Sequence, residues 1–399
     1  MQDKPQGDKM HKLIALTLTS VLLGACALFG GRDVFAQTSS DSFDSLRQMV
    51  DNGDIPGVVV CIATPGKPTV TEVYGWADLE RKAPMTKDSF FWIASNTKAI
   101  VAAAVMICVE EGLLDLDVPV DTYLPQLKEL KIEKKQDDGT VLLCPVVNKP
   151  TLRQALSHTA GFRFITPYQE KYGIDSLPVQ RHMTIVGLTP LIAEPGARYS
   201  YSNLGIDVAQ ACVEVVAKKP FETFLQERVF DPLEMRDATF YPSEEQMKRL
   251  ALPYGWNSNA QKLEKSTFSQ TPSLDDGSPR YAEGGGGLFA TADDMLKFYQ
   301  MLSGNGVGSN GKRILKPESV AEISKKQTGD LDSKYGFGVV VNNEWFGHGG
   351  AFGTQGVAYR DGSVAAVYMI AVTGVPKQGA AENVFREAVA NYAREGKSN

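Results

Sequence analysis

A serine and a lysine have the types and spacing of a covalent catalyst: Ser95 precedes Lys98 by three residues. Residues 99–109, which follow, are apolar on every face and contain neither Pro nor Gly, so they predict a buried helix. Both side chains would then lie on one side of its first turn. Burial favours the neutral form of a lysine, and a neutral amine can accept the proton of a serine hydroxyl. The pair therefore predicts an activated serine nucleophile.

The same spacing recurs at Ser309 and Lys312, inside the polar, glycine-rich residues 304–312. Such a run predicts a solvated turn with no apolar support. The surrounding sequence therefore separates the two pairs, and it favours Ser95.

Two further segments could complete a site around Ser95. Tyr201 and Asn203 follow a Glu-Pro-Gly turn and precede a helix-like run at residues 206–217. A phenol can move a proton, and an amide two residues later can hold a carbonyl. His348 lies in a glycine-rich stretch, residues 345–353, whose glycines would let a substrate approach the backbone.

Taken in order, these segments resemble the β-lactamase-related serine hydrolases, in particular the class C type with its penicillin-binding-protein and esterase relatives. The motifs are Ser-x-x-Lys at Ser95, Tyr-x-Asn at Tyr201, and His-x-Gly from His348 to Gly350. The resemblance runs from about residue 42 onward, and residues 156–162, 194–196 and 284–294 also look like the family.

The resemblance implies a role for each matching residue. Ser95 would become acylated, while Lys98 and Tyr201 would share the acid/base work, with either one as the base that activates Ser95. Asn203 would hold the substrate. The backbone N–H groups of Ser95 and Ala351, the latter just after Gly350, would form the oxyanion hole.

His348 occupies the position where true β-lactamases of this type carry the lysine of Lys-Thr-Gly. Imidazole has a usual pKa of about 6.5, so it would offer a cation only at mildly acidic pH. We therefore expect neutral esters or amides to be preferred at pH 7 to 8, with anionic substrates gaining as the pH falls. His158, in a Ser-His-Thr-Ala-Gly turn, is interpreted as structural.

These observations predict a serine hydrolase that cleaves an ester or amide through an acyl-enzyme and most resembles an esterase. Alternatives are a peptidoglycan D-Ala-D-Ala carboxypeptidase or D-aminopeptidase, a true β-lactamase, and a catalytically silent penicillin-binding-like protein. The substrate would be a small acyl ester or amide, or a peptidoglycan fragment. No cofactor is implied, and no metal, because His158, His182 and His348 are scattered without Cys or carboxylate spacing.

Composition and charge narrow the class of protein further. The chain has 399 residues, a net charge of −6 and a pI of about 5.5, with no run of Lys or Arg. These values argue against nucleic-acid binding.

The first residues read as a targeting segment. Lys9 and Lys12 precede the apolar residues 13–29. Leu-Gly-Ala-Cys ending at Cys26 would make that cysteine a lipid anchor, whereas Val-Phe-Ala ending at Ala36 would be an ordinary cleavage site. We expect residues 1–36 to be a signal peptide or lipoprotein signal, and the protein to be exported: periplasmic, secreted or membrane-anchored.

The remaining chain, residues 37–399, reads as one hydrolase domain. Strand-like runs at 57–63, 69–74, 336–341, 356–359 and 364–370 flank a mostly helical middle, with helices expected at 45–52, 221–229, 293–303 and 380–394. Together with the resemblance, this predicts an α+β fold of the β-lactamase/transpeptidase type. Its antiparallel sheet lobe would combine residues 42–94 and 295–399, with helices packed on it, and residues 95–294 would form a helical lobe.

Overall fold

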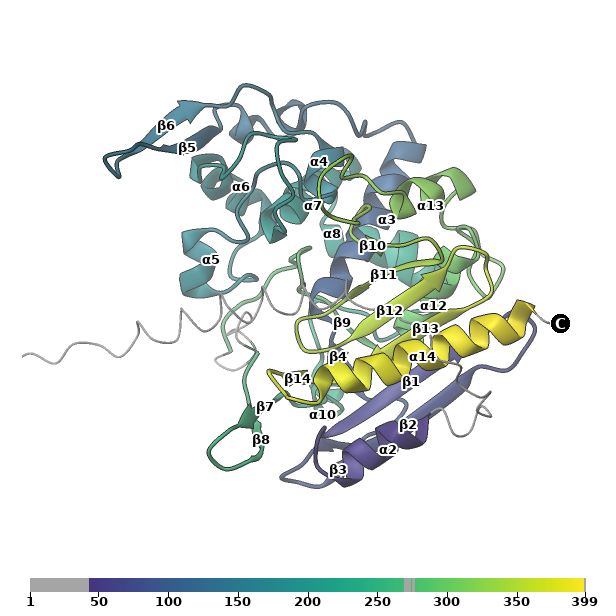
Figure 1. Ribbon diagram of the computed structural model, residues 1–399. Coiled ribbons are helices and arrows are strands. Elements are labelled where there is room, and N and C mark those ends of the chain that lie inside the picture. The colour runs from purple at the N-terminus through teal and green to yellow at the C-terminus, as the bar shows by residue number, and fades with distance from the viewer. Residues whose placement is uncertain (1–42, 269–273, 275–276, 398–399) are drawn as a thin grey trace, which may run out of the picture. The chain divides into compact units, whose positions relative to one another are not determined.

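The computed structural model describes residues 43–268, 274 and 277–397 (Figure 1). The expected signal peptide, with Cys26 and Ala36, lies outside the described residues. Within the described ranges, no helix is long and apolar enough to cross a bilayer.

A seven-stranded antiparallel sheet is built from both ends of the chain, as predicted. Its strands, in spatial order, are β10 (Val340–Val341), β11 (Trp345–Gly349), β12 (Gln355–Tyr359), β13 (Ala365–Met369), β1 (Gly57–Ala63), β2 (Val70–Asp78) and β3 (Ala83–Pro84). Strand β1 joins the two halves, because it pairs with β2 on one side and places Cys61 opposite Val367 of β13 on the other.

The central strand β1 reads Gly-Val-Val-Val-Cys-Ile-Ala and is buried along its whole length. Alternate side chains point to opposite faces of a strand. Val58 and Val60 therefore pack with helices α2 (Asp44–Asp51) and α14 (Gln378–Lys397), whereas Val59 and Cys61 belong to the larger core that includes α12 (Ala292–Ser303). Figure 1 shows α14 lying along the sheet.

The helical part of the chain surrounds α3 (Thr97–Glu110), whose residues from Thr97 to Cys108 are all buried, as its apolar sequence predicts. Its other helices are α4 (Leu152–Leu156), α5 (Pro167–Tyr172), α6 (Val179–Leu188), α7 (Asn203–Ala217), α8 (Phe221–Leu225), α9 (Asp231–Leu233), α10 (Glu244–Lys248) and α13 (Pro317–Ser324). Helix α7 packs directly against α3, and this contact brings two predicted site segments together.

Smaller sheets connect these layers. Strand β4 (Phe90–Trp92) pairs with β9 (Phe289–Thr291), and β5 (Lys131–Lys135) pairs with β6 (Val141–Pro145). A third small sheet joins β14 (Val372–Thr373), β7 (Tyr254–Asn257) and β8 (Lys262–Lys265).

Two elements are shorter than their sequences suggested. The expected strand at 336–341 contributes only β10, because Gly338 turns through a left-handed backbone (φ 63°) and lies against the Lys98 carbonyl, where a Cβ would be 2.3 Å from the oxygen. The expected helix at 221–229 is α-helical only through Leu225, and then widens into a π-turn, Gln226–Phe230.

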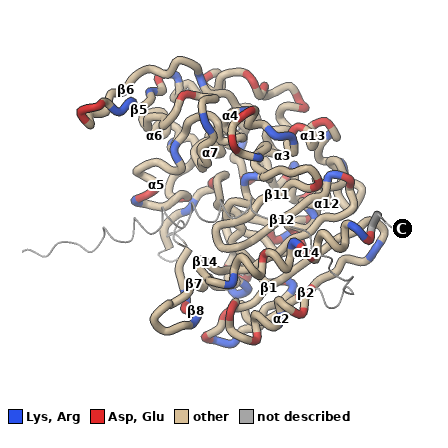
Figure 2. The backbone as a smooth tube through the Cα atoms, in the orientation of Figure 1, with Lys and Arg blue, Asp and Glu red and all other residues tan. Residues whose placement is uncertain are grey.

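The charged side chains lie mainly on the outer elements. Figure 2 shows acidic and basic residues interspersed along α2 and α14, while β1 has none.

Candidate active site

Ser95 lies in a tight turn between a strand and the central helix. Strand β4 leads into the 3₁₀ turn Ala94–Asn96, from which α3 starts at Thr97. Ala94 has a left-handed backbone (φ 46°), a conformation that costs energy for a residue with a side chain. The Thr97 hydroxyl holds this turn by donating to the Ala94 carbonyl at 2.6 Å. The sharp turn leaves Ser95 half-buried at the end of a buried helix.

Lys98 is completely buried, and its amine faces Ser95. The Nζ atom lies 3.0 Å from Ser95 Oγ and 2.8 Å from Asn203 Oδ1, and it also donates to the Gly285 carbonyl. Burial lowers the pKa of Lys98 to about 7, although nearby carboxyl groups act in the opposite direction. At neutral pH this amine is therefore able both to take and to give a proton.

Tyr201 and Asn203 reach Lys98 from the start of α7. Ser202, between them, caps the helix by accepting from the Gly205 N–H at 3.0 Å and donates to the Arg163 carbonyl at 2.6 Å. Lys98 Nζ lies 4.8 Å from the centre of the Tyr201 ring. Burial raises the pKa of Tyr201, against a hydrogen bond with Ser95 that lowers it. Tyr201 is therefore a neutral phenol at physiological pH.

His348 closes the site from β11, with its ring stacked 6.0 Å from the Tyr201 ring. Its Nδ1–H donates to the Gly349 carbonyl at 2.6 Å, so Nε2 carries the lone pair, and this atom is buried without a partner. Burial lowers the pKa of His348 to about 3. The expectation that this ring gains a proton in mildly acidic solution is therefore wrong, because desolvation keeps it neutral.

The turn after His348 packs onto the residues that precede Ser95. The N–H of Gly350 donates to the Thr354 carbonyl at 2.7 Å, and a Cβ on Gly350 would stand 2.4 Å from the Ile93 carbonyl oxygen. Only glycine permits this approach, which brings exposed Ala351 to the side of the Ser95 turn. The structure thus brings all seven predicted site residues to one place: Ser95, Lys98, Tyr201, Asn203, His348, Gly350 and Ala351.

Comparison with known proteins places this geometry in a family. The Beta-lactamase family matches residues 44–391. The chain belongs to this family. Lovastatin esterase of Penicillium rubens is 30% identical over 293 residues, which span 70% of this chain and 71% of that protein. Esterase EstB of Burkholderia gladioli is 27% identical over 310 residues, 71% of this chain and 74% of that protein.

Among solved structures, EstCE1, described as a hydrolase with promiscuous acyltransferase activity, has a TM-score of 0.72 and 25% identity. The match covers 88% of this chain and 98% of that one. The chain is thus a serine-hydrolase member of the beta-lactamase family, with esterases among its relatives.

The decoy pair and the structural histidine lie where the sequence indicated. Ser309 and Lys312 belong to an exposed turn bounded by the bridge between Val307 and Arg313. His158 is buried behind Tyr201, with ring centres 4.5 Å apart, and its Nδ1 accepts from the Ser202 N–H at 3.2 Å. It supports the segment that carries Tyr201.

Sequence reasoning missed a group of residues around the pair. Asn96 donates to Thr354 Oγ1 at 3.0 Å and accepts from the Tyr299 hydroxyl at 2.7 Å, so it ties the Ser95 turn to the strand turn. Asp207 and Glu283 are buried carboxyl groups close enough to Lys98 to affect its pKa. The signal for Asp207 was an acidic residue inside an otherwise apolar helix, whereas Glu283 was hidden in an irregular loop.

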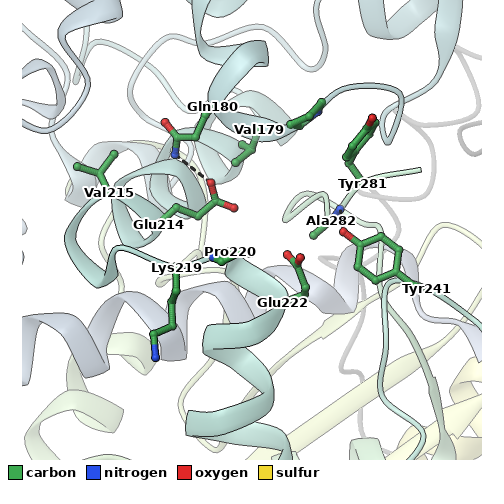
Figure 3. Close-up of a pocket in the computed structure, with 11 residues that line it drawn as sticks. Val179, Gln180, Glu214, Val215, Lys219, Pro220, Glu222, Tyr241, Tyr281 and Ala282 are labelled. Carbon is green, nitrogen blue, oxygen red and sulfur yellow. Dashed lines mark hydrogen bonds between the residues drawn. The ribbon is translucent and has the colours of Figure 1, made fainter. Parts of the chain in front are cut away.

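A pocket of about 490 Å³ lies elsewhere, between α6, α7 and α8 (Figure 3). Its wall includes Glu214, which accepts from Gln180 Nε2 at 3.0 Å, and the aromatic rings of Tyr241 and Tyr281. None of the predicted site residues lines it.

Proposed function

We propose that the protein hydrolyses neutral esters of small acyl groups through an acyl-Ser95 intermediate. The contact of 3.0 Å between Lys98 Nζ and Ser95 Oγ, made by a lysine whose pKa is about 7, carries this proposal. The esterases among its relatives support the ester as the bond that is cleaved.

The two proton carriers take different steps. Ser95 Oγ attacks the acyl carbon while its proton passes to Lys98 Nζ, because Lys98 rather than Tyr201 is basic enough near neutral pH. The negative charge on the carbonyl oxygen would receive the N–H groups of Ser95 and Ala351. Tyr201 then gives its proton to the departing alkoxide and regains one from Lys98. Water cleaves the acyl-enzyme by the same roles in reverse and restores Ser95.

The side of the site occupied by His348 favours an uncharged substrate. A neutral imidazole with a pKa near 3 cannot pair with a carboxylate, which β-lactams and D-Ala-D-Ala peptides carry. A true β-lactamase and a peptidoglycan carboxypeptidase are therefore the weaker candidates.

The test is a substrate panel measured with the wild type and Ser95→Ala. Short p-nitrophenyl esters should be hydrolysed by the wild type far faster than nitrocefin or a D-Ala-D-Ala peptide, and Ser95→Ala should lose that activity. Ser309→Ala, the matched control in the exposed turn, should retain it. Faster cleavage of the peptide than of every ester would replace the proposed substrate class.

We also infer that the protein is exported, on the charge and apolar pattern of its first residues. Fractionation of cells that express the full chain, with mass spectrometry of the mature N-terminus, tests this. A lipidated Cys26 or an N-terminus after Ala36 would each support export, and intact protein in the cytoplasm would contradict it.

A further inference from the structure

Two carboxyl groups are buried together behind Lys98. Asp207, in the second turn of α7, is fully buried, and Glu283, just before the glycine-rich loop 284–287, is 4% exposed. A hydrogen bond joins the two carboxyl groups. Because a carboxylate can only accept, this bond requires a proton on one of them.

The surrounding donors indicate where that proton resides. Asp207 accepts from Gln169 Nε2 at 3.3 Å and from the Gly285 N–H, contacts that favour its ionised form. Burial raises the pKa of both groups, that of Asp207 to about 6 and that of Glu283 well above its usual range. At pH 7 the pair therefore holds one proton, on Glu283, and one negative charge, on Asp207.

Glu283 also shapes the loop that contacts the lysine. Its Oε2 accepts from the Gly286 N–H at 2.5 Å, and a Cβ on Gly285 would stand 2.4 Å from its Oε1. The neighbouring Gly284 N–H donates to Gln210 Oε1 at 2.7 Å. These contacts fix the position from which the Gly285 carbonyl accepts the Lys98 amine.

No other described residue that faces Lys98 supplies a negative charge. The atoms that its amine contacts, Ser95 Oγ, Asn203 Oδ1 and the Gly285 carbonyl, are all uncharged. The side chains around it that could titrate are neutral at pH 7: Tyr201 before α7, His158 after α4 and His348 on β11. His182, on the far side of Asp207, is neutral too, with its pKa lowered to about 4 by burial.

We propose that Asp207 and Glu283 form a positioning pair, which shares one proton, supplies the single negative charge that lets buried Lys98 hold the proton of Ser95, and fixes the Gly285 carbonyl against its amine. The pair touches no substrate, and its role rests on the proposed function. Without the charge, desolvation would make the ammonium form of Lys98 costly at the moment when Ser95 attacks.

The decisive variant removes the charge without removing the volume. Asp207→Asn alone is insufficient, because Glu283 would lose the repulsion of its neighbour and could ionise in its place. The double variant Asp207→Asn/Glu283→Gln is neutral at every pH of interest. It should move the acid limb of kcat/KM down by about one pH unit or more, the scale of an opposite charge at close range. Well below the limb, each unit is a tenfold larger fraction of the variant's own maximum.

Two variants separate charge from shape. Glu283→Gln should leave the acid limb in place, since an amide can donate to Asp207 as the protonated acid does, and Asp207 keeps its charge. Glu214→Gln removes a buried carboxyl group from the same helix α7, whose partners are Gln180 and the Phe221 N–H, and it should also leave the limb in place (Figure 3). A limb that shifts equally in Glu283→Gln and the double variant would overturn the assignment of the charge to Asp207.

A second readout does not depend on turnover. In protein labelled with ¹³C-lysine, the Lys98 signal, identified by its loss in Lys98→Met, should titrate about one pH unit or more lower in the double variant than in wild type. If esters are not cleaved but this shift is found, the proposed function fails and the pair stands. An unchanged Lys98 titration in a folded double variant overturns the pair.

Discussion

At the scale of single residues, burial gives the two proton carriers opposite properties. The same desolvation that lowers the pKa of Lys98 to about 7 raises the pKa of Tyr201, because burial disfavours an ammonium ion and a phenolate alike. The choice of base, which the sequence left open, is therefore decided in favour of Lys98 by an energy that depends on the three-dimensional surroundings.

We predict that Lys98→Ala and Tyr201→Phe each lower kcat/KM for an ester by roughly two orders of magnitude or more, the scale of general acid/base catalysis. In wild type, kcat/KM should rise with pH through about 7, as Lys98 loses its proton. Steady-state kinetics from pH 5 to 9, with circular dichroism as a check of folding, measure both. A folded Tyr201→Phe with wild-type turnover would remove Tyr201 from the mechanism.

A second prediction concerns His348 and the charge of the substrate. The ratio of kcat/KM for an anionic and a neutral acyl donor should be flat from pH 5.5 to 8.5, because a pKa near 3 leaves the ring neutral throughout. His348→Lys should raise that ratio at least about tenfold, the effect of one added charge contact of about 1.4 kcal/mol. The neutral ester serves as the internal control. A ratio that rises below pH 6.5 in wild type would show that the ring titrates.

At the scale of elements, the site exists where three segments end: the Ser95 turn before α3, the start of α7 and the end of β11. Asn96 links the first to the third, since it contacts both Thr354 and Tyr299, and Thr354 Oγ1 donates to the Ile93 carbonyl at 3.1 Å. The distance between the two oxyanion N–H groups should therefore depend on Asn96.

We predict that Asn96→Ala lowers kcat for ester hydrolysis by about tenfold or more with little change in KM, because a small misplacement of transition-state contacts costs rate rather than binding. Asn383→Ala, at an exposed position on α14, is the control and should match wild type. Equal losses in kcat and affinity would point to general damage instead.

The sequence predicted these elements unequally, for physical reasons. The apolar run after Lys98 and the β-branched run of β1 have patterns that only burial explains, so α3 and the central hairpin were predictable. Asp207 and Glu283 were not, because they meet only when α7 packs beside the loop 284–287, and local periodicity carries no record of such a contact. The pKa of His348 was wrong for the same reason, since it depends on how deeply β11 is buried.

At the scale of the whole domain, the sheet closes only when the first and last thirds of the chain meet at β1 and β13. Helix α14 completes this arrangement, because Phe385 is fully buried and lies 5.4 Å from Tyr368 of β13, ring centre to ring centre. The C-terminal helix is thus part of the core on the sheet face opposite α12.

We predict that Phe385→Ala lowers the free energy of unfolding by about 3–5 kcal/mol, the usual cost of removing a buried phenylalanine. Urea denaturation at pH 7 measures this, with exposed Asn383→Ala as the control on the same helix. A loss below about 1 kcal/mol would mean that α14 contributes little to the folded state.

The central claim is that Ser95 carries the acyl group, and mass spectrometry of the trapped intermediate tests it most directly. Wild-type protein mixed with a fluorophosphonate, or quenched in acid during turnover of a p-nitrophenyl ester, should gain one adduct, and peptide mapping should place it on Ser95. Lys98→Ala should form the adduct far more slowly, and Ser95→Ala should not form it. An adduct on Ser309, or ester turnover that persists in Ser95→Ala, would contradict the account.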